Sequence, residues 1–364
     1  MKVGQIAIKG HTGLDWKRWL FNLSKEEILG LDIGSSAVKL VQMHRTNGSY
    51  MVTAAALVNI VDGTADKAEH KQINTVRAIR ESVLGSGTTT RLAVCGVSGP
   101  EAAVRYFKFP QMPPEEMEGA VVLEAAQICP FSVDDGAVDY RLTGRGKGGV
   151  SGVLVAATNK LIERKVRLTE GASLGCALMD VDGLALLNCL TECEKGEDSK
   201  AAVVLNVGNS CTTLAVMSEE GVPFVRDIAY AGSDIIRQIA AEHKVSVEII
   251  ANVLTGSEKT RQLRLEFGDS LSGTCRKLVA DVTDTLRYYA THEKSAAIEE
   301  IFVCGGFALV DGFVELLAGQ LSEKVTLWNP FEKMRCEAGR ECVELLQKSG
   351  PAMAVAAGLA MRSV

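Results

Sequence analysis

Two passages of the chain share one pattern of apolar and polar positions. Each is an apolar segment that ends in a turn of small polar residues and is followed by a second apolar segment, at residues 28–43 (ILGLDIGSSAVKLVQM) and 202–217 (AVVLNVGNSCTTLAVM). Apolar segments of this length around a small polar turn predict paired β-strands. Because the two passages are alike, the sequence indicates an internal duplication.

Strands and helices are predicted to alternate along the rest of the chain, which is typical of the α/β class. The expected elements are a helix near residues 72–84, a strand at 91–97, helices at 233–254 and 271–291, a strand at 300–304 and a small-residue helix at 352–360. The pattern changes between residues 104 and 142, where Pro113 and Pro114 start an acidic helix and Pro130 ends it. We interpret this region as a small inserted subdomain.

Composition excludes several classes of function. The 364 residues are 47% hydrophobic and 23% charged, with a formal net charge of −6, so there is no electrostatic case for nucleic-acid binding. The ten cysteines form no C-x-x-C pair and read as reduced thiols of a cytoplasmic protein. No stretch reaches the roughly 18 apolar residues of a membrane span.

The first turn carries residues suited to binding an anion. Gly34 lets backbone N–H groups face a phosphate, Ser35 and Ser36 add hydroxyls, and Lys39 adds a positive charge. Asp32 can hold a magnesium ion through water. A plain Gly-Ser hairpin turn explains the same residues, so the turn alone is a weak signal.

A later strand ends in Gly305 and Gly306 before a predicted helix, which allows a flat ligand such as adenine or ribose to approach the backbone. Two phosphate turns followed by a glycine pair resemble the actin, Hsp70 and sugar-kinase superfamily. Within it, the chain resembles the PilM family of pilus-assembly proteins through four blocks, at residues 105–142 (RYFKFPQMPPEEMEGAVVLEAAQICPFSVDDGAVDYRL), 303–317 (VCGGFALVDGFVELL), 328–331 (WNPF) and 354–362 (AVAAGLAMR).

The resemblance implies an α/β, actin-like (ribonuclease H-like) fold of two duplicated lobes, with an inserted subdomain of the FtsA and PilM type. We therefore expect these parts: a leader at 1–26, a first lobe at 27–198 with the insertion at about 101–150, a second lobe at 199–330 with a helical subdomain at about 236–290, and C-terminal helices at 331–364 that return to the first lobe.

The resemblance also implies a site for ATP or ADP with Mg²⁺. Asp32 would hold the metal through water, Ser35 and Ser36 would meet the terminal phosphates, and Lys39 would reach the β-phosphate, with Gly34 giving close approach. The second turn would contribute Asn206, Gly208, Asn209 and Thr212. Gly232, Gly305 and Gly306 would border the nucleoside.

Two departures from the superfamily pattern predict at most a weak ATPase. The second turn usually opens with an aspartate, and here Asn206 keeps the shape without the charge. The A-E-x-L-K run of PilM relatives reads IANVL at residues 250–254. No catalytic residue is assigned, because the acidic and amide candidates are better explained as exposed or capping groups: Glu124, Gln127, Asp180 and Asp182.

The function implied by the resemblance is a cytoplasmic scaffold for type IV pilus assembly. It would bind the N-terminal tail of a PilN-like inner-membrane protein and so lie at the inner membrane through its partner. Pilus motor ATPases and further copies of the chain are additional candidate partners. The alternatives are a sugar or small-metabolite kinase, which needs an intact metal site, and an FtsA-like filament protein, which needs a C-terminal amphipathic anchor that is not expected after Val364.

Overall fold

The computed structural model describes residues 28–46, 48–61, 68–146, 148–194, 201–218, 221–255, 268–292 and 298–362. The leader predicted at residues 1–26 lies outside these ranges. In the described part of the chain, no helix is long and apolar enough to cross a membrane.

The first lobe is built on a six-stranded sheet in the order β14-β3-β2-β1-β4-β8. Its strands are β1 (Leu29–Ile33), β2 (Ala37–Thr46), β3 (Ser49–Asn59), β4 (Leu92–Val97), β8 (Gly175–Val181) and β14 (Arg335–Cys336). The β1–β2 and β2–β3 pairs are antiparallel, whereas β4 is parallel to both β1 and β8. Helices α1 (Ala68–Ser86) and α3 (Asn159–Gly171) pack against this sheet and against each other.

The second lobe contains a five-stranded sheet in the order β11-β10-β9-β12-β13. Its strands are β9 (Ala202–Val207), β10 (Thr212–Met217), β11 (Pro223–Ile228), β12 (Glu300–Cys304) and β13 (Lys324–Leu327), and its helices are α5 (Gly232–His243), α6 (Val247–Thr255), α8 (Gly268–His292) and α9 (Phe313–Gln320). The five strands repeat the first lobe's arrangement of an antiparallel meander followed by two parallel strands. The duplicated α/β fold expected from the sequence is therefore confirmed.

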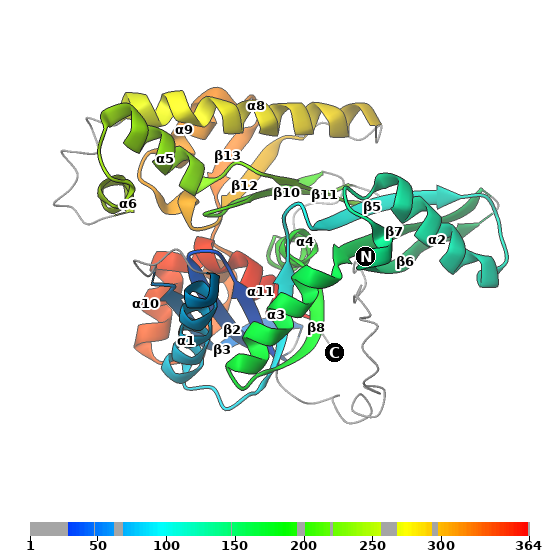
Figure 1. Cartoon of the computed structure of the whole chain (residues 1–364), viewed down its shortest axis with the longest axis horizontal. Coiled ribbons are helices and arrows are strands. Elements are labelled where there is room, and N and C mark those ends of the chain that lie inside the picture. The colour runs from blue at the N-terminus through cyan, green and yellow to red at the C-terminus, as the bar shows by residue number, and fades with distance from the viewer. Residues whose placement is uncertain are drawn as a thin grey trace.

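The inserted subdomain is a separate three-stranded sheet in the order β5-β7-β6, which extends to the right of the two lobes in Figure 1. It comprises β5 (Ala102–Phe109), α2 (Pro114–Ile128), β6 (Gly136–Gly146) and β7 (Gly149–Thr158). Apolar residues of α2 and the sheet form its core: Phe107, Met117, Val121, Ala125, Val150 and Leu154. The strand β7 continues past the predicted limit at residue 150 because its residues complete the antiparallel ladders with both β5 and β6.

Helices between the two sheets join the lobes. The helix α4 (Asp182–Cys193) contacts β10 of the second lobe and α11 (Ala354–Ala360), and α11 also packs on β1 and β2; Figure 1 shows α4 and α11 between the upper and lower lobes. Gly30 makes this packing possible, since an added Cβ would lie 2.0 Å from the carbonyl oxygen of Ala356. The helix α10 (Arg340–Ser349) packs on β3.

Successive side chains along β1 point to opposite faces of the sheet, and each face packs against different helices. Leu29, Leu31 and Ile33 belong to the core shared with α1 and α3, whereas Gly30 faces α11. Each fully buried leucine or isoleucine contributes about 1.5–3 kcal/mol of hydrophobic stabilisation. Asp32 lies two residues after Gly30, so the pleat of the strand places its side chain on the same face, toward the second lobe.

Candidate functional site

The two predicted phosphate turns have the same backbone structure. The N–H of Gly34 donates to the carbonyl of Ala37 at 3.0 Å, and the N–H of Gly208 donates to the carbonyl of Cys211 at 3.1 Å. An added Cβ would lie 2.9 Å from the Ala37 carbonyl oxygen at Gly34 and 2.7 Å from the Cys211 carbonyl oxygen at Gly208. Glycine is therefore required in both turns for the same reason.

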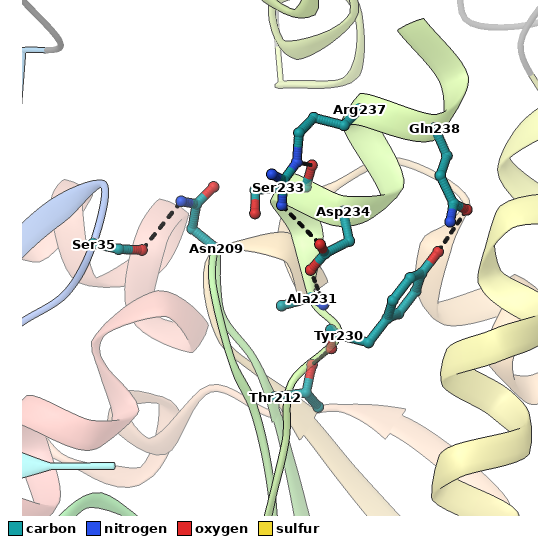
Figure 2. Close-up of polar contacts among 9 residues, drawn as sticks. All are labelled: Ser35, Asn209, Thr212, Tyr230, Ala231, Ser233, Asp234, Arg237 and Gln238. Carbon is teal, nitrogen blue, oxygen red and sulfur yellow. Dashed lines mark hydrogen bonds and ion pairs between the residues drawn. The ribbon is translucent and has the colours of Figure 1, made fainter. Parts of the chain in front are cut away.

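The tips of the two turns contact each other. Asn209 Nδ2 donates to Ser35 Oγ at 3.1 Å, although the residues are 174 positions apart, and Figure 2 shows this bond spanning the gap between the turns. The structure thus brings together the tips of two turns that come from different lobes. Ser36 is exposed beside this contact.

The first turn is charged. Asp32 and Lys39 are directly paired across β1 and β2, and Lys39 Nζ donates to Asp32 Oδ2 at 3.0 Å. The two side chains are only 13% and 14% exposed. The carboxylate and the ammonium group predicted to hold a metal and a phosphate are therefore adjacent and largely shielded from water.

The second turn is neutral at the equivalent positions. Asn206 is paired with Thr213 across β9 and β10, and Asn206 Oδ1 accepts a weak bond from Cys304 Sγ at 3.8 Å. Thr213 Oγ1 donates to Asp227 Oδ1 at 2.5 Å. Because Asn206 has no carboxylate, this turn gives a metal ion no charge of its own.

The structure takes Thr212 out of the predicted phosphate contacts. Its side chain is completely buried, and Thr212 Oγ1 donates to the carbonyl of Tyr230 at 2.8 Å, as Figure 2 shows. The hydroxyl therefore fixes the loop that leads into α5. Alternation of side chains along β10 turns Thr212 inward and its neighbour Thr213 toward the first lobe.

The N-terminus of α5 is attached to the second turn. The N–H of Gly232 donates to the carbonyl of Gly208 at 3.1 Å, and the N–H of Ser233 donates to the carbonyl of Asn209 at 2.8 Å. The N–H of Ala231 donates to Asp234 Oδ2 at 3.0 Å, which caps the helix (Figure 2). Gly232 is buried, and an added Cβ would lie 2.4 Å from the Phe307 ring, so its close packing is structural.

The two glycines of the pair, Gly305 and Gly306, have different surroundings. Gly305 has a φ of +97°, an added Cβ would lie 2.4 Å from the carbonyl oxygen of Val207, and its N–H donates to the carbonyl of Pro351 at 2.9 Å. Gly306 is exposed and has open space around its Cα. Gly305 therefore fixes the loop, whereas the backbone at Gly306 is exposed.

Two buried acidic residues near the turns, Asp182 and Asp227, have different neighbours. Asp182, at the start of α4, is buried; burial first, and then the charge of Asp32, raise its pKa to about 7, while Lys165 opposes the shift. Burial also raises the pKa of Asp227, which accepts from Thr213 and from the N–H of Gly99 at 2.6 Å. The N–H of Gly99 belongs to the first lobe, so Asp227 makes a second bond between the lobes.

The acidic and amide candidates named from the sequence lie in different parts of the structure. Asp180 is buried in an ion pair with Arg362, which donates to both of its oxygens, one of them at 2.8 Å. Glu124 and Gln127 lie on α2 in the inserted subdomain. Among them, Asp182 has a raised pKa, caused first by burial and then by the charge of Asp32.

Sequence reasoning missed Lys165 and Asp227. Lys165 Nζ donates to the carbonyl of Ile33 at 2.7 Å, directly before the first turn. Both residues lie in ordinary helix and strand segments, and only tertiary packing brings Lys165 to Ile33 and Asp227 to Gly99, so no motif marks them.

A cleft of about 180 Å³ lies beside the turns, between the inserted subdomain and the second lobe. Residues of β5 and of the segment before it form one wall, and residues of β11 form the other: Gly99, Pro100, Ala103, Val104, Arg105, Val225, Arg226 and Asp227. Its surface is mainly apolar, and the exposed Arg105 and Arg226 lie on opposite walls.

Comparison with known proteins identifies the family. The family described as type IV pilus assembly protein PilM matches residues 30–364. The chain belongs to the PilM family. This confirms the resemblance noted from the motifs and associates the chain with type IV pilus assembly.

Solved structures agree with this assignment. A chain in the PilM–PilN type IV pilus biogenesis complex is 26% identical, with a TM-score of 0.78 over 93% of this chain and 99% of that one. The ethanolamine utilization protein EutJ from Carboxydothermus hydrogenoformans is 14% identical, with a TM-score of 0.53 over 94% and 93% of the two chains. A nucleotide-free diol dehydratase-reactivating factor is 10% identical, with a TM-score of 0.50 over 92% and 99%. The last two share the fold alone.

Proposed function

We propose that this PilM-family protein is a nucleotide-binding scaffold of the type IV pilus assembly platform that captures the N-terminal tail of a PilN-like inner-membrane protein. The observation that carries the proposal is the similarity, over nearly the whole of both chains, to the structure of a PilM–PilN complex. Through this partner, the protein would work on the cytoplasmic face of the inner membrane.

We further propose that the two turns and the glycine pair bind ATP or ADP with Mg²⁺. Asp32 would hold the metal through water, while Ser35, Ser36 and Lys39 would face the phosphates. Gly208 and Asn209 would approach from the second lobe, with Gly306 open to the nucleoside and Gly232 and Gly305 shaping the loops behind it. Bound Mg²⁺ would neutralise phosphate charge.

The nucleotide would act mainly as a conformational ligand. The Ser35–Asn209 bond lies where the terminal phosphates would enter, so a nucleotide would replace a direct contact between the lobes with contacts through phosphate. A ligand shifts the angle between lobes only if it binds the two arrangements with different affinity. The neutral Asn206 favours binding with slow hydrolysis.

The cleft between β5 and β11 suits a peptide better than a metabolite. At about 180 Å³, it is smaller than the roughly 300–1,000 Å³ of typical small-molecule sites. An apolar side chain of an extended segment would fit such a space, and Arg105 or Arg226 could pair with an acidic neighbour.

The peptide proposal is tested by fluorescence anisotropy with a labelled N-terminal peptide of the PilN-like protein encoded by the same genome. We expect saturable binding, no binding of a scrambled peptide, and an affinity that changes when ATP and Mg²⁺ are added. Equal binding of both peptides would refute the scaffold role.

The nucleotide proposal is tested by calorimetric titration with ATP and Mg²⁺, with phosphate release followed on the same samples. We expect binding that is lost in Asp32→Ala and little phosphate release. Fast release would favour an enzyme instead, and absence of binding would leave a purely structural adaptor.

A further inference from the structure

Two cysteine sulfurs lie in contact at the edge of the first-lobe sheet. Cys336 Sγ lies 3.8 Å from Cys342 Sγ, where one thiol donates a weak hydrogen bond to the other. Cys336 belongs to the outer strand β14, and Cys342 lies in the first turn of α10. Both thiols are free and partly exposed, and their neighbours Arg335 and Glu341 are exposed. Small solutes therefore have access to the pair.

A second close pair of cysteines lies in a different environment. Cys189 Sγ and Cys193 Sγ are 4.0 Å apart on α4, and Cys189 is completely buried in the core between the sheets. Burial keeps a thiol both protonated and out of reach of an oxidant. The two pairs thus have similar distances between their sulfurs but unequal access from solvent.

The chain between Cys336 and Cys342 has room to adjust to a covalent bond. In a disulfide the two sulfurs are about 2.0 Å apart, so they must approach each other from their present 3.8 Å. The segment between them contains Gly339, which is exposed and has open space around its Cα. The adjustment is therefore confined to an exposed turn and a two-residue strand.

Metal binding is the other common use of paired cysteines. A structural zinc ion takes four ligands. Within the described ranges, no three histidine, cysteine or acidic side chains are grouped to hold a metal. The pair therefore lacks the ligands of a zinc site, which favours oxidation of the thiols.

We propose that Cys336 and Cys342 form a reversible disulfide with a low-molecular-weight disulfide such as oxidised glutathione as the oxidant, and that this bond locks the start of α10 to β14. The thiolate of Cys336 attacks one sulfur of the small disulfide, and a thiolate leaves. The thiolate of Cys342 then attacks the Cys336 sulfur, and a second thiolate leaves. Two cysteine thiols are thus oxidised, one small disulfide is reduced to two thiols, and the two cysteine protons end on those thiols.

The order of attack follows from the surroundings of Cys342. Burial, and then the charge of Cys336 and a hydrogen bond with it, raise the pKa of Cys342 to about 12. Cys342 is therefore a poor first nucleophile, which leaves the first attack to Cys336. Once Cys336 is bonded to the small thiol, its charge no longer opposes ionisation of Cys342, and Cys342 completes the disulfide.

The bond would join two elements that cover β3. The strand β14 pairs with β3 at Met51 and Val52, the N–H of Glu337 donates to the carbonyl of Val52 at 2.9 Å, and α10 packs on β3. A cross-link reduces the conformational freedom of the unfolded chain. The oxidised protein should therefore be more stable, and α10 should open less often. This inference is independent of nucleotide and peptide binding.

The test equilibrates the full chain in buffers with graded ratios of reduced to oxidised glutathione, followed by acid quenching, alkylation of free thiols and peptide mass spectrometry. Trypsin cleaves after Arg335 and Arg340, so the two cysteines fall in separate peptides, residues 336–340 and 341–348. We expect these peptides to become cross-linked as oxidised glutathione increases, and to separate again in dithiothreitol. The oxidised form should melt a few degrees higher, with slower amide hydrogen exchange in α10.

Single variants test the order of attack. Cys342→Ser should retain glutathione on Cys336, whereas Cys336→Ser should lose most of the glutathione uptake in this region. Cys193→Ser removes one thiol of the second close pair and should leave the cross-link unchanged. Melting of each variant in dithiothreitol shows whether it folds, and the result on the unmodified protein does not depend on them.

Three results would overturn the inference. Absence of the cross-linked peptides at every glutathione ratio, or an equal yield of a Cys189–Cys193 cross-link, rules out selective oxidation of the exposed pair. A cross-link that changes neither the Tm nor the hydrogen exchange of α10 rules out the lock. Retention of glutathione on Cys342 in Cys336→Ser, with none on Cys336 in Cys342→Ser, reverses the order of attack.

Discussion

The two turns at the cleft have one backbone design and two kinds of chemistry. Each closes with the same N–H to carbonyl bond, and each has its glycine at the same point. The first turn pairs Asp32 with Lys39, whereas the second has Asn206 and Thr213 at the equivalent positions. Duplication preserved the shape because the strands dictate it. The side chains could diverge because the bond that closes each turn joins backbone groups only.

The largest expected difference between the lobes is the loss of stability when the glycines after β4 and β12 are replaced by alanine. Gly99 and Gly305 have φ angles of +92° and +97°, but only Gly305 is crowded, with the Val207 carbonyl oxygen 2.4 Å from an added Cβ. Gly305→Ala should lower the free energy of unfolding by about 2–4 kcal/mol through strain and collision. Gly99→Ala should cost about 1 kcal/mol through strain alone. Urea denaturation measures both, with Gly306→Ala as the control; equal costs for Gly99 and Gly305 would contradict the crowding argument.

The next largest expected effect is a dependence of folding stability on pH, which arises from Asp182 in the first lobe. The pKa of Asp182 is raised to about 7 in the folded protein, above the roughly 3.9 of an unfolded aspartate. Between these values the unfolded state binds fewer protons, so stability should fall as pH rises from about 4 to 7 and the loss should then level off. Asp182→Asn should remove on the order of 1–3 kcal/mol of this loss. Denaturation at pH 5 and pH 8 checks the prediction, and identical pH profiles for the two proteins would refute it.

A smaller effect on stability is expected when the charged pair of the first turn is replaced by the neutral residues of the second. Lys39→Thr leaves the mostly buried Asp32 without its cation and should destabilise the protein by about 1 kcal/mol. Adding Asp32→Asn should recover most of that loss, because a neutral pair then replaces an unpaired charge. A double-mutant cycle of unfolding free energies gives the coupling. Simple additivity would mean that the ion pair contributes nothing.

The smallest expected effect on stability comes from removing the hydrogen bond between the two turns. Asn209→Ala and Ser35→Ala each remove the same hydrogen bond, which contributes about 0.5–1.5 kcal/mol. The double variant should cost no more than either single one, as measured by thermal unfolding. If each substitution also shifts ATP affinity to the same extent, the contact competes with nucleotide; if neither does, the turns close independently of ligand.

Sequence patterns predicted that each of the two passages forms a pair of strands around a tight turn, and the structure confirms both pairs. The pattern also located the helix of small residues near the C-terminus, now α11, and the helix α8. It misjudged Thr212, because the pattern shows that a residue lies at a strand start but not which face of the sheet its side chain meets.

What the sequence alone determined is local: strand alternation, the two turns, the glycine pair and the neutral Asn206. It also determined the family, because motif combinations survive as short segments. The tertiary structure decided what long-range packing controls. It placed Asp182 over Gly96, brought Lys165 to the carbonyl of Ile33, and set Asp227 against Gly99 of the other lobe. These contacts join segments far apart in the chain, and burial changes the chemistry of a carboxylate only once its neighbours have removed the water around it.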